Sequence, residues 1–162
     1  MTDYRTILVP YDFSEHADAA LSTAVDVAGR LGADCHLLHI VQPVTIPYGT
    51  LTTDQAVLPP PNMLEIRESA SKALEDVAQR LERADVKLET HVIEASNLAS
   101  AICEMASKLA ANLIVMGTHG RTGIAHVFLG SVAERTLRDA PCPVLTVRAA
   151  AQPQTPTEGG AA

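Results

Sequence analysis

Tryptophan is absent from this chain of 162 residues, and aromatic residues make up only 3% of it. So few aromatic side chains leave little material for the stacking surfaces that bind single-stranded nucleic acids. The chain also lacks an excess of basic residues, since 19 acidic against 12 basic side chains give a formal net charge of −7 at pH 7. A surface of that sign repels a phosphate backbone. We therefore expect no nucleic acid partner, although backbone amides can still hold a single nucleotide.

Cysteine is scarce as well, because Cys35, Cys103 and Cys142 are odd in number, widely spaced and without a CxxC motif. That pattern favours small buried thiols over a disulfide framework or a zinc site. The sequence has neither a signal peptide nor an apolar run of about 18 residues, the length that a membrane-spanning helix needs. We therefore expect a cytoplasmic protein that has no membrane partner.

What the sequence does contain is a regular alternation of apolar strands and amphipathic helices. Strands are predicted over 6–11, 35–41, 86–95, 111–117 and 142–148, and helices between Ser14 and Gly32 and over 62–83, 97–110 and 126–139. Ser14 suits the N-cap of the first helix, and Gly32 suits the position that ends it. Alternation of this kind predicts a single α/β domain, an open parallel sheet of five strands with helices on both faces. The first and fourth strands are the most apolar, which favours the strand order 3-2-1-4-5.

Two segments fall outside this alternation. Residues 42–61 include five prolines and form a long loop, and loops of that length are usually mobile or functional. Residues 149–162 have neither periodicity nor large apolar side chains and are expected to be a disordered tail. The folded domain is therefore expected to span residues 1–148.

The predicted strand order places a ligand site between the first and fourth strands. Ligands of open parallel sheets bind outside the carboxyl ends of the strands, where neighbouring connections leave toward opposite faces. Asp12 follows the first strand and Gly117 ends the fourth, so they should face one another across this point. Asp12 has a second possible role, since it precedes a helix and could cap it.

The segment after the fourth strand, "GTHGRTGIAHVFLGS" at 117–131, is rich in glycine. Glycine allows positive φ and lets a ligand approach the main chain, and successive amides followed by a helix can hold a phosphate. The Ser131 hydroxyl can donate to a phosphate oxygen, and Arg121 is the permanent cation of the segment. Valine at Gly117 or Gly130 is expected to weaken nucleotide binding, by occupying the phosphate approach and by disfavouring positive φ.

Two familiar phosphate motifs do not fit this segment. Its glycines are spaced GxxGxxG rather than GxGxxG, and the sequence has no GxxxxGK[ST]. The spacing of Gly117, Gly120 and Gly130-Ser131, with two and then nine residues between, resembles the nucleotide-binding pattern of the universal stress protein family. The resemblance also covers "ILVPYDFSEHADAAL", "LLHIV" and "NLIVMGTHGRTGIAHVFLGSVAERTLRDAPCPVLTVR", and so extends over roughly residues 4–148.

This resemblance implies an α/β fold that binds ATP, commonly with a divalent metal such as Mg²⁺ or Mn²⁺, and that acts in stress responses as a homodimer. Asp12 and the main chain of Ile40 would hold the adenosine part. The resemblance implies the remaining contacts as follows: Pro10 and Met116 line the adenosine site, Gly117, Gly120, Gly130 and Ser131 hold the phosphates, and Val132 and Arg121 lie beside them. Asn112 stands where an aspartate is common in the family, and "EASNLASAI" lacks the glycine and proline often found there.

We therefore expect an ATP-binding regulatory protein that senses the nucleotide through a homodimer paired along the edge strand, 143–148, and that has at most weak ATP hydrolysis. Two alternatives stay open. One is a slow ATPase or nucleotide-dependent transferase, for which the candidate bases are His119, His126 and Asp12. The other is a dimeric adaptor for another protein, with a vestigial glycine loop.

Neither a catalytic residue nor a metal ligand is assigned from the sequence. "LGSVA" around Ser131 is not the GxSxG elbow of a nucleophilic serine. His36 and His39 on the second strand and His91 on the third lack a recognisable metal-ligand spacing. They are therefore expected to be surface or core side chains.

Overall fold

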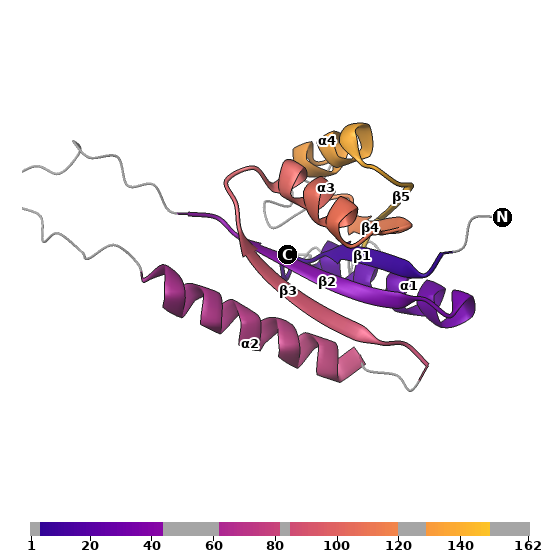
Figure 1. Cartoon of the computed structure of the whole chain (residues 1–162), viewed down its shortest axis with the longest axis horizontal. Coiled ribbons are helices and arrows are strands. Elements are labelled where there is room, and N and C mark those ends of the chain that lie inside the picture. Colours follow the sequence, from indigo (N-terminus) through magenta and orange to yellow (C-terminus); the bar gives the residue numbers. More distant parts are fainter. Residues whose placement is uncertain (1–3, 44–61, 82–84, 120–128, 150–162) are drawn as a thin grey trace, which may run out of the picture.

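A computed structural model describes residues 4–43, 62–81, 85–119 and 129–149 of the chain. Their strands form one parallel sheet in the order β3-β2-β1-β4-β5 (Figure 1). The strands are β1 (Thr6–Pro10), β2 (Asp34–Val41), β3 (Leu88–Glu94), β4 (Leu113–Gly117) and β5 (Val144–Val147). This confirms the predicted strand order, with β1 and β4 side by side in the middle and β5 at an edge.

Helices cover both faces of the sheet, as the alternation predicts. The helices are α1 (Glu15–Leu31), α2 (Met63–Leu81), α3 (Leu98–Lys108) and α4 (Ser131–Asp139). Figure 1 shows α2 running along β3 on one side, and α3 and α4 together on the other. Successive residues of β1 point to opposite faces. Ile7 and Val9 pack in a core with α1 and α2, whereas Leu8 packs with α3 and α4, and all three side chains are fully buried.

The ends of α1 are fixed by the residues that the sequence suggests. The Ser14 hydroxyl accepts a hydrogen bond from the Ala17 N–H at 3.2 Å, so Ser14 is the N-cap. Gly32 follows the helix with φ of 65°, and its N–H donates to the carbonyl of Ala28. This left-handed backbone ends the helix without the steric cost that a side chain would add.

The start of α4 differs from the prediction over 126–139. Residues 126–128 lie outside the described residues, but Leu129 and Gly130 precede the helix, which begins at Ser131. Gly130 is the N-cap, with φ of −61° and ψ of 147°, and its N–H donates to the carbonyl of Thr118 at 2.8 Å. That hydrogen bond joins the end of β4 to the start of α4. The N-terminus of α4 is thereby held beside the carboxyl end of the sheet.

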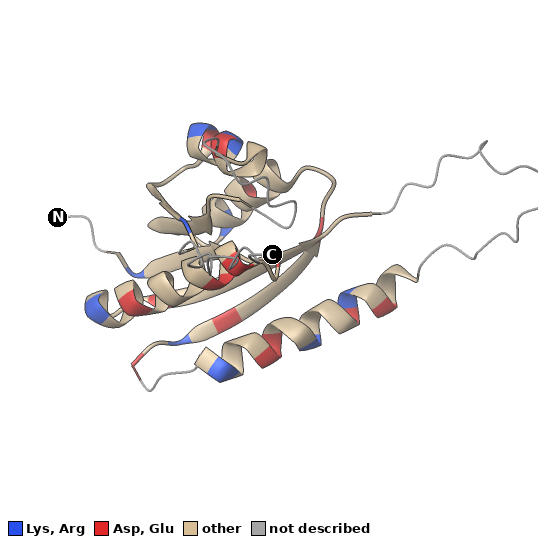
Figure 2. Cartoon of the chain, turned by 180° about the vertical axis from the view of Figure 1, so that it is seen from behind, with Lys and Arg blue, Asp and Glu red and all other residues tan. Residues whose placement is uncertain are grey.

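Charged side chains of both signs are interspersed along α2 and along the other helices (Figure 2). In the described part of the chain, no helix combines the length and the apolar character needed to cross a membrane. Most of the expected loop, from residue 44 to residue 61, and all but the first residue of the expected tail lie outside the described residues.

Candidate functional site

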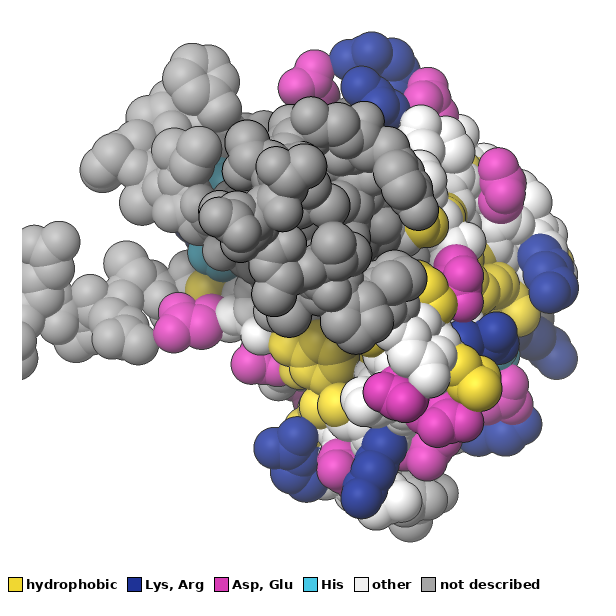
Figure 3. Space-filling view, turned by 90° about the vertical axis from the view of Figure 1, so that its left-hand side faces the viewer, with side chains coloured by type: hydrophobic (Ala, Val, Ile, Leu, Met, Phe, Trp, Pro, Cys, Tyr) yellow, Lys and Arg dark blue, Asp and Glu magenta, His cyan; other side chains and the backbone are white. Residues whose placement is uncertain are grey.

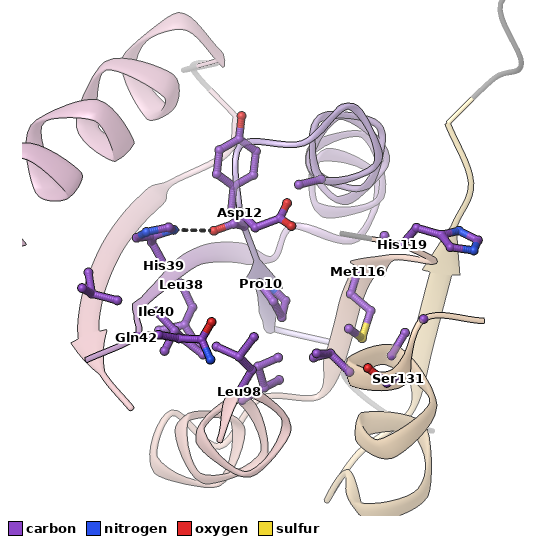
Figure 4. A pocket seen from close by; sticks show the side chains of 18 of the residues that line it. Pro10, Asp12, Leu38, His39, Ile40, Gln42, Leu98, Met116, His119 and Ser131 are labelled. Atoms are coloured by element: carbon purple, nitrogen blue, oxygen red, sulfur yellow. Dashed lines mark hydrogen bonds between the residues drawn. The ribbon is translucent and has the colours of Figure 1, made fainter. Parts of the chain in front are cut away.

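A crevice opens between the carboxyl ends of β1 and β4, at the point that the strand order predicts. Its volume is about 570 Å³, within the range of small-molecule sites. Apolar side chains from several elements line much of it: Pro10, Leu38, Ile40, Leu98, Ile102 and Met116. Figure 4 shows Asp12 and Ser131 on opposite sides, with Pro10 and Met116 between them. The end of the molecule shown in Figure 3 carries hydrophobic side chains among charged ones of both signs.

Asp12 reaches the crevice from the turn that joins β1 to α1. Its Oδ1 accepts hydrogen bonds from the Ser14 N–H at 3.1 Å and from the Ser14 hydroxyl at 2.6 Å. Ser14 caps α1, so Asp12 orients the capping residue and does not itself cap the helix. A carboxylate has two oxygens with about four acceptor positions. Asp12 can therefore support this turn and also accept hydrogen bonds from a ligand in the crevice.

The turn after β1 contains an unusual backbone conformation. Phe13 has φ of 64°, in the left-handed region that bulky side chains rarely adopt. Its ring packs on Tyr11, with centroids 5.1 Å apart, and on His39, with centroids 4.9 Å apart. His39 Nδ1 lies 2.8 Å from the Tyr11 carbonyl, which fixes this nitrogen as the N–H donor. These contacts hold the strained turn, and with it Asp12, in one position.

The N-terminus of α4 forms the wall opposite Asp12. The first N–H groups of a helix have no partner within the helix and give this end a partial positive charge. At α4 the N-cap is Gly130, which makes no side-chain cap, and the next three residues, Ser131, Val132 and Ala133, line the crevice. The wall therefore offers backbone donors and the Ser131 hydroxyl to a negatively charged group.

The glycines of the crevice are needed for close packing and not for positive φ, so that part of the expectation is wrong. Neither Gly117 nor Gly130 is in the left-handed region, and among the described glycines only Gly32 is. A Cβ at Gly117 would lie 2.8 Å from the Cβ of His16 and 2.9 Å from its backbone carbon. A Cβ at Gly130 would lie 3.0 Å from the Thr118 carbonyl oxygen. Each glycine thus lets another part of the backbone approach.

Tyr11 connects the crevice wall to α1. Its hydroxyl donates a hydrogen bond to Asp18, and its side chain is buried. Burial raises the pKa of Tyr11 strongly, and the hydrogen bond with Asp18 raises it further. The phenol is therefore a neutral donor that fixes the end of β1 to the first turn of α1.

His119, a candidate base for the enzymatic alternative, lines the crevice but is turned from its centre. Its Nδ1 lies 3.0 Å from the Thr118 hydroxyl, and its ring packs on His16 with centroids 5.3 Å apart. Figure 4 shows the ring pointing away from the other labelled side chains. The Nε2 atom is buried without a hydrogen-bond partner in the described part of the chain. This orientation gives no support to a role as the base.

The structure brings most of the predicted site residues together. Those that line the crevice are Pro10, Asp12, Ile40, Met116, Gly117, Gly130, Ser131 and Val132, whereas Gly120 and Arg121 lie outside the described residues. Sequence reasoning missed His39 and Gln42 at the end of β2 and Leu98 at the start of α3. Their positions at the carboxyl edge of the predicted sheet were the signal that could have identified them.

Comparison with known proteins gives a consistent result. The model of the family described as "Universal stress protein family" matches residues 3–148. A universal stress protein of Methanocaldococcus jannaschii is 34% identical over 145 residues, which are 90% of this chain and 82% of the relative. Among solved structures, a universal stress protein of Lactobacillus plantarum has a TM-score of 0.74 at 26% identity, and the match covers 91% of this chain and 100% of that chain.

Two further solved structures of the same fold are described with a bound nucleotide. One is a universal stress protein in complex with cAMP, with a TM-score of 0.63 at 21% identity over 91% of this chain and 99% of that chain. The other is a universal stress protein of Archaeoglobus fulgidus in complex with dAMP, with a TM-score of 0.58 at 24% identity over 90% of this chain and 98% of that chain. At these identities the likeness is one of fold.

Proposed function

Because the chain belongs to the universal stress protein family, we propose that it binds ATP in the crevice and acts as a regulatory protein in stress responses. The observation that carries this proposal is the uncapped N-terminus of α4, which lies across an apolar cavity from the Asp12 carboxylate. The wall at α4 suits an anion, and the wall at Asp12 suits ligand hydroxyl groups that donate hydrogen bonds. The complexes of fold relatives with cAMP and dAMP support an adenine nucleotide as the ligand.

The two walls divide the nucleotide between them. The Asp12 carboxylate accepts hydrogen bonds from the adenosine hydroxyls, the main chain of Ile40 holds the base, and Pro10 and Met116 pack against it. The phosphates lie on the start of α4, against the amides of Ser131 and Val132 and beside Gly117 and Gly130, with Gly120 and Arg121 as further contacts. Each helical residue adds only about 1.5 Å along the axis, so the N–H groups of consecutive residues are close enough to bind one phosphate group.

A divalent ion fits the same crevice. Mg²⁺ and Mn²⁺ prefer oxygen ligands, usually a few carboxylates together with the phosphates of the substrate. The Ser131 hydroxyl supplies an oxygen at the phosphate end of the cavity, where the ion would also bind phosphate oxygens. The ion would neutralise phosphate charge. The residues of this chain position the nucleotide whether or not the ion is present.

The sensing step of the proposal uses the edge strand β5, along which two copies of the chain pair. Strand β5 lies at the edge of the sheet, where unpaired backbone groups favour pairing with another strand, and Leu145 is 39% exposed there. Gly117 is in register with Val147, and the Thr118 N–H donates to the Val147 carbonyl at 2.9 Å. Phosphates beside Gly117 would therefore lie next to β5, the strand along which we propose that the two copies pair.

Ser131→Asp tests the phosphate end of the proposal. Asp is favourable in the first turn of a helix, and residue 131 already has a Cβ, so the fold should be kept. The new carboxylate repels phosphate groups, so the affinity for ATP with Mg²⁺ should fall by about tenfold or more, equivalent to ~1.4 kcal/mol. Adenosine, which has no phosphate, should lose much less affinity. Isothermal titration calorimetry with both ligands measures the difference.

Two variants complete this experiment. Ser22→Asp adds the same charge on the exposed side of α1, away from the crevice lining, and should leave both affinities unchanged. Asp12→Asn keeps an oxygen acceptor for Ser14 and should weaken adenosine and ATP to a similar degree. Failure of the wild-type protein to bind ATP at millimolar concentration would overturn the proposal. Equal loss of adenosine and ATP in Ser131→Asp would contradict the placement of the phosphates.

A further inference from the structure

A second group of side chains with ligand chemistry lies on strands β2 and β3, on the face of the sheet that carries α3. His36 is directly opposite Glu89 in the register of these strands, and His91 is opposite Leu38. Glu89 and His91 are two residues apart on one strand, so their side chains point to the same face. The sheet thereby gathers two imidazoles and one carboxylate, although 55 positions separate His36 from His91.

The distances within this His36–Glu89–His91 cluster match those between the ligands of a small metal ion. His36 Nδ1 lies 3.0 Å from His91 Nε2 and 3.5 Å from Glu89 Oε2. One ligand atom from each side chain lies within 4.8 Å of the other two. In a tetrahedral site with bonds of about 2.0–2.1 Å to nitrogen, neighbouring ligand atoms are about 3.3 Å apart. A shared ion requires the side chains to turn so that the lone pairs of both nitrogens point to it.

The surroundings of the cluster orient its carboxylate and leave one side of the cluster open to solvent. Lys87 forms an ion pair with Oε1 of Glu89, so the carboxylate is held with Oε2 toward His36. The His36 side chain is 12% exposed and that of Glu89 is 39% exposed. Solvent can reach the carboxylate side of the cluster.

From this geometry we propose that His36, Glu89 and His91 form a site for Zn²⁺ or a similar late first-row divalent ion, with water in the fourth position. Two imidazoles and one carboxylate are a common three-ligand set for zinc, and imidazole favours such ions over Mg²⁺. The ion joins the edge strand β3 to β2. The site is separate from the nucleotide crevice, whose lining includes none of the three ligands.

The same atoms can instead form a hydrogen bond between the two histidines without a metal, and this arrangement would respond differently to added metal. Without a metal, one of the two facing nitrogens carries a proton and donates a hydrogen bond to the other. Metal binding displaces that proton, because a coordinating imidazole nitrogen needs its lone pair. The two arrangements are therefore distinguished by direct titration with metal.

The experiment uses the full-length protein, freed of metal with a chelator and kept without nucleotide. Co²⁺ is added first, because its visible absorption is intense only in four-coordinate sites, and Zn²⁺ is then titrated to displace it. We expect one ion per chain at this site. His36→Gln, His91→Gln and Glu89→Gln should each lower the Zn²⁺ affinity by about tenfold or more and remove the four-coordinate Co²⁺ spectrum. Circular dichroism checks that each variant is folded.

Glu94→Gln provides the matched control for Glu89→Gln. Glu94 is exposed on the same strand and is not part of the cluster, so the change removes an equal charge without removing a ligand. Its zinc affinity should equal that of the wild type. A wild-type protein without the Co²⁺ spectrum would overturn the proposal in favour of the hydrogen-bonded pair. Zinc binding that survives the loss of both histidines would also overturn it, since the ion would then lie elsewhere.

Discussion

Substitution of Gly117 by alanine gives the most direct test of how the crevice is built. The added Cβ would lie 2.8 Å from the Cβ of His16, 2.9 Å from its backbone carbon and 3.0 Å from its backbone oxygen. Real Cβ atoms essentially never approach other heavy atoms below 3.0 Å. Two of these three atoms belong to the backbone of α1, so rotation of a side chain cannot relieve the clash. The helix or the strand has to shift.

The expected cost follows from this geometry. Overpacking a tight interior costs about 1–3 kcal/mol, and a clash with backbone belongs to the upper part of that range. We therefore expect Gly117→Ala to lower the free energy of unfolding by about 2–3 kcal/mol. For a domain of this size, each kcal/mol corresponds to ~2–4 °C in Tm, so the midpoint should fall by roughly 4–12 °C. Urea unfolding and a thermal scan measure these two quantities.

Gly32→Ala is the matched control. A Cβ at Gly32 would meet nothing within 4 Å, and its only cost is the left-handed backbone, with φ of 65°. That cost is ~1 kcal/mol, so the loss of stability should be smaller than at Gly117. The Gly117 Cβ would point toward His16 and not into the crevice, so folded Gly117→Ala should keep most of its nucleotide affinity. An unchanged Tm combined with a large loss of ATP affinity would refute this reasoning and restore the phosphate approach as the reason for glycine.

Two further substitutions test contacts at the amino ends of the central strands and at the crevice wall. Asn112→Ala removes an oxygen that accepts hydrogen bonds from the Arg5 N–H at 3.0 Å and the Thr6 N–H at 3.1 Å. We therefore expect the free energy of unfolding to fall by about 1–2 kcal/mol. Asn112→Asp keeps the acceptor, so its free energy of unfolding, measured in urea, should stay within about 0.5 kcal/mol of the wild type. Tyr11→Phe removes a phenol whose pKa is raised above its ordinary value of 10.0. The unfolded chain ionises first as the pH rises through that value, so wild-type stability falls there, and the fall should be smaller in Tyr11→Phe.

The sheet could be predicted because its central strands are buried on both faces. Ile7, Leu8 and Val9 are successive residues that are all fully buried, and such continuous apolar runs are typical of parallel strands between two layers of helices. The strand order then placed the crevice, and with it Asp12 and Gly117, by topology alone. Ser131 was assigned from the glycine spacing and the family resemblance. None of this depended on the detailed packing of side chains.

What the sequence could not predict depended on register and on contacts distant in the chain. His36 and His91 meet only because β2 and β3 pair with a particular offset, which no local spacing encodes. The clash partner of Gly117 is His16 on another element, so the glycine was attributed to positive φ and to the approach of a phosphate instead of to close packing. The departure at Asn112 also became interpretable only in the structure. Its side-chain oxygen accepts from two amides at the start of β1, a role that an aspartate oxygen also performs.

The caps of the four helices in the described residues explain why we propose the phosphate site at α4. Side chains accept from first-turn amides at α1, α2 and α3, where the acceptors are Ser14, Asn62 and Asn97. Those helices satisfy part of their own positive ends. Helix α4 begins after Gly130, which has no side chain to offer, and its first residues line the crevice. A ligand phosphate would supply the missing acceptor, and the Asp side chain introduced by Ser131→Asp would compete for the same amides. The loss of ATP affinity in that variant therefore measures how much the hydrogen bonds between the first amides of α4 and the phosphate contribute to binding.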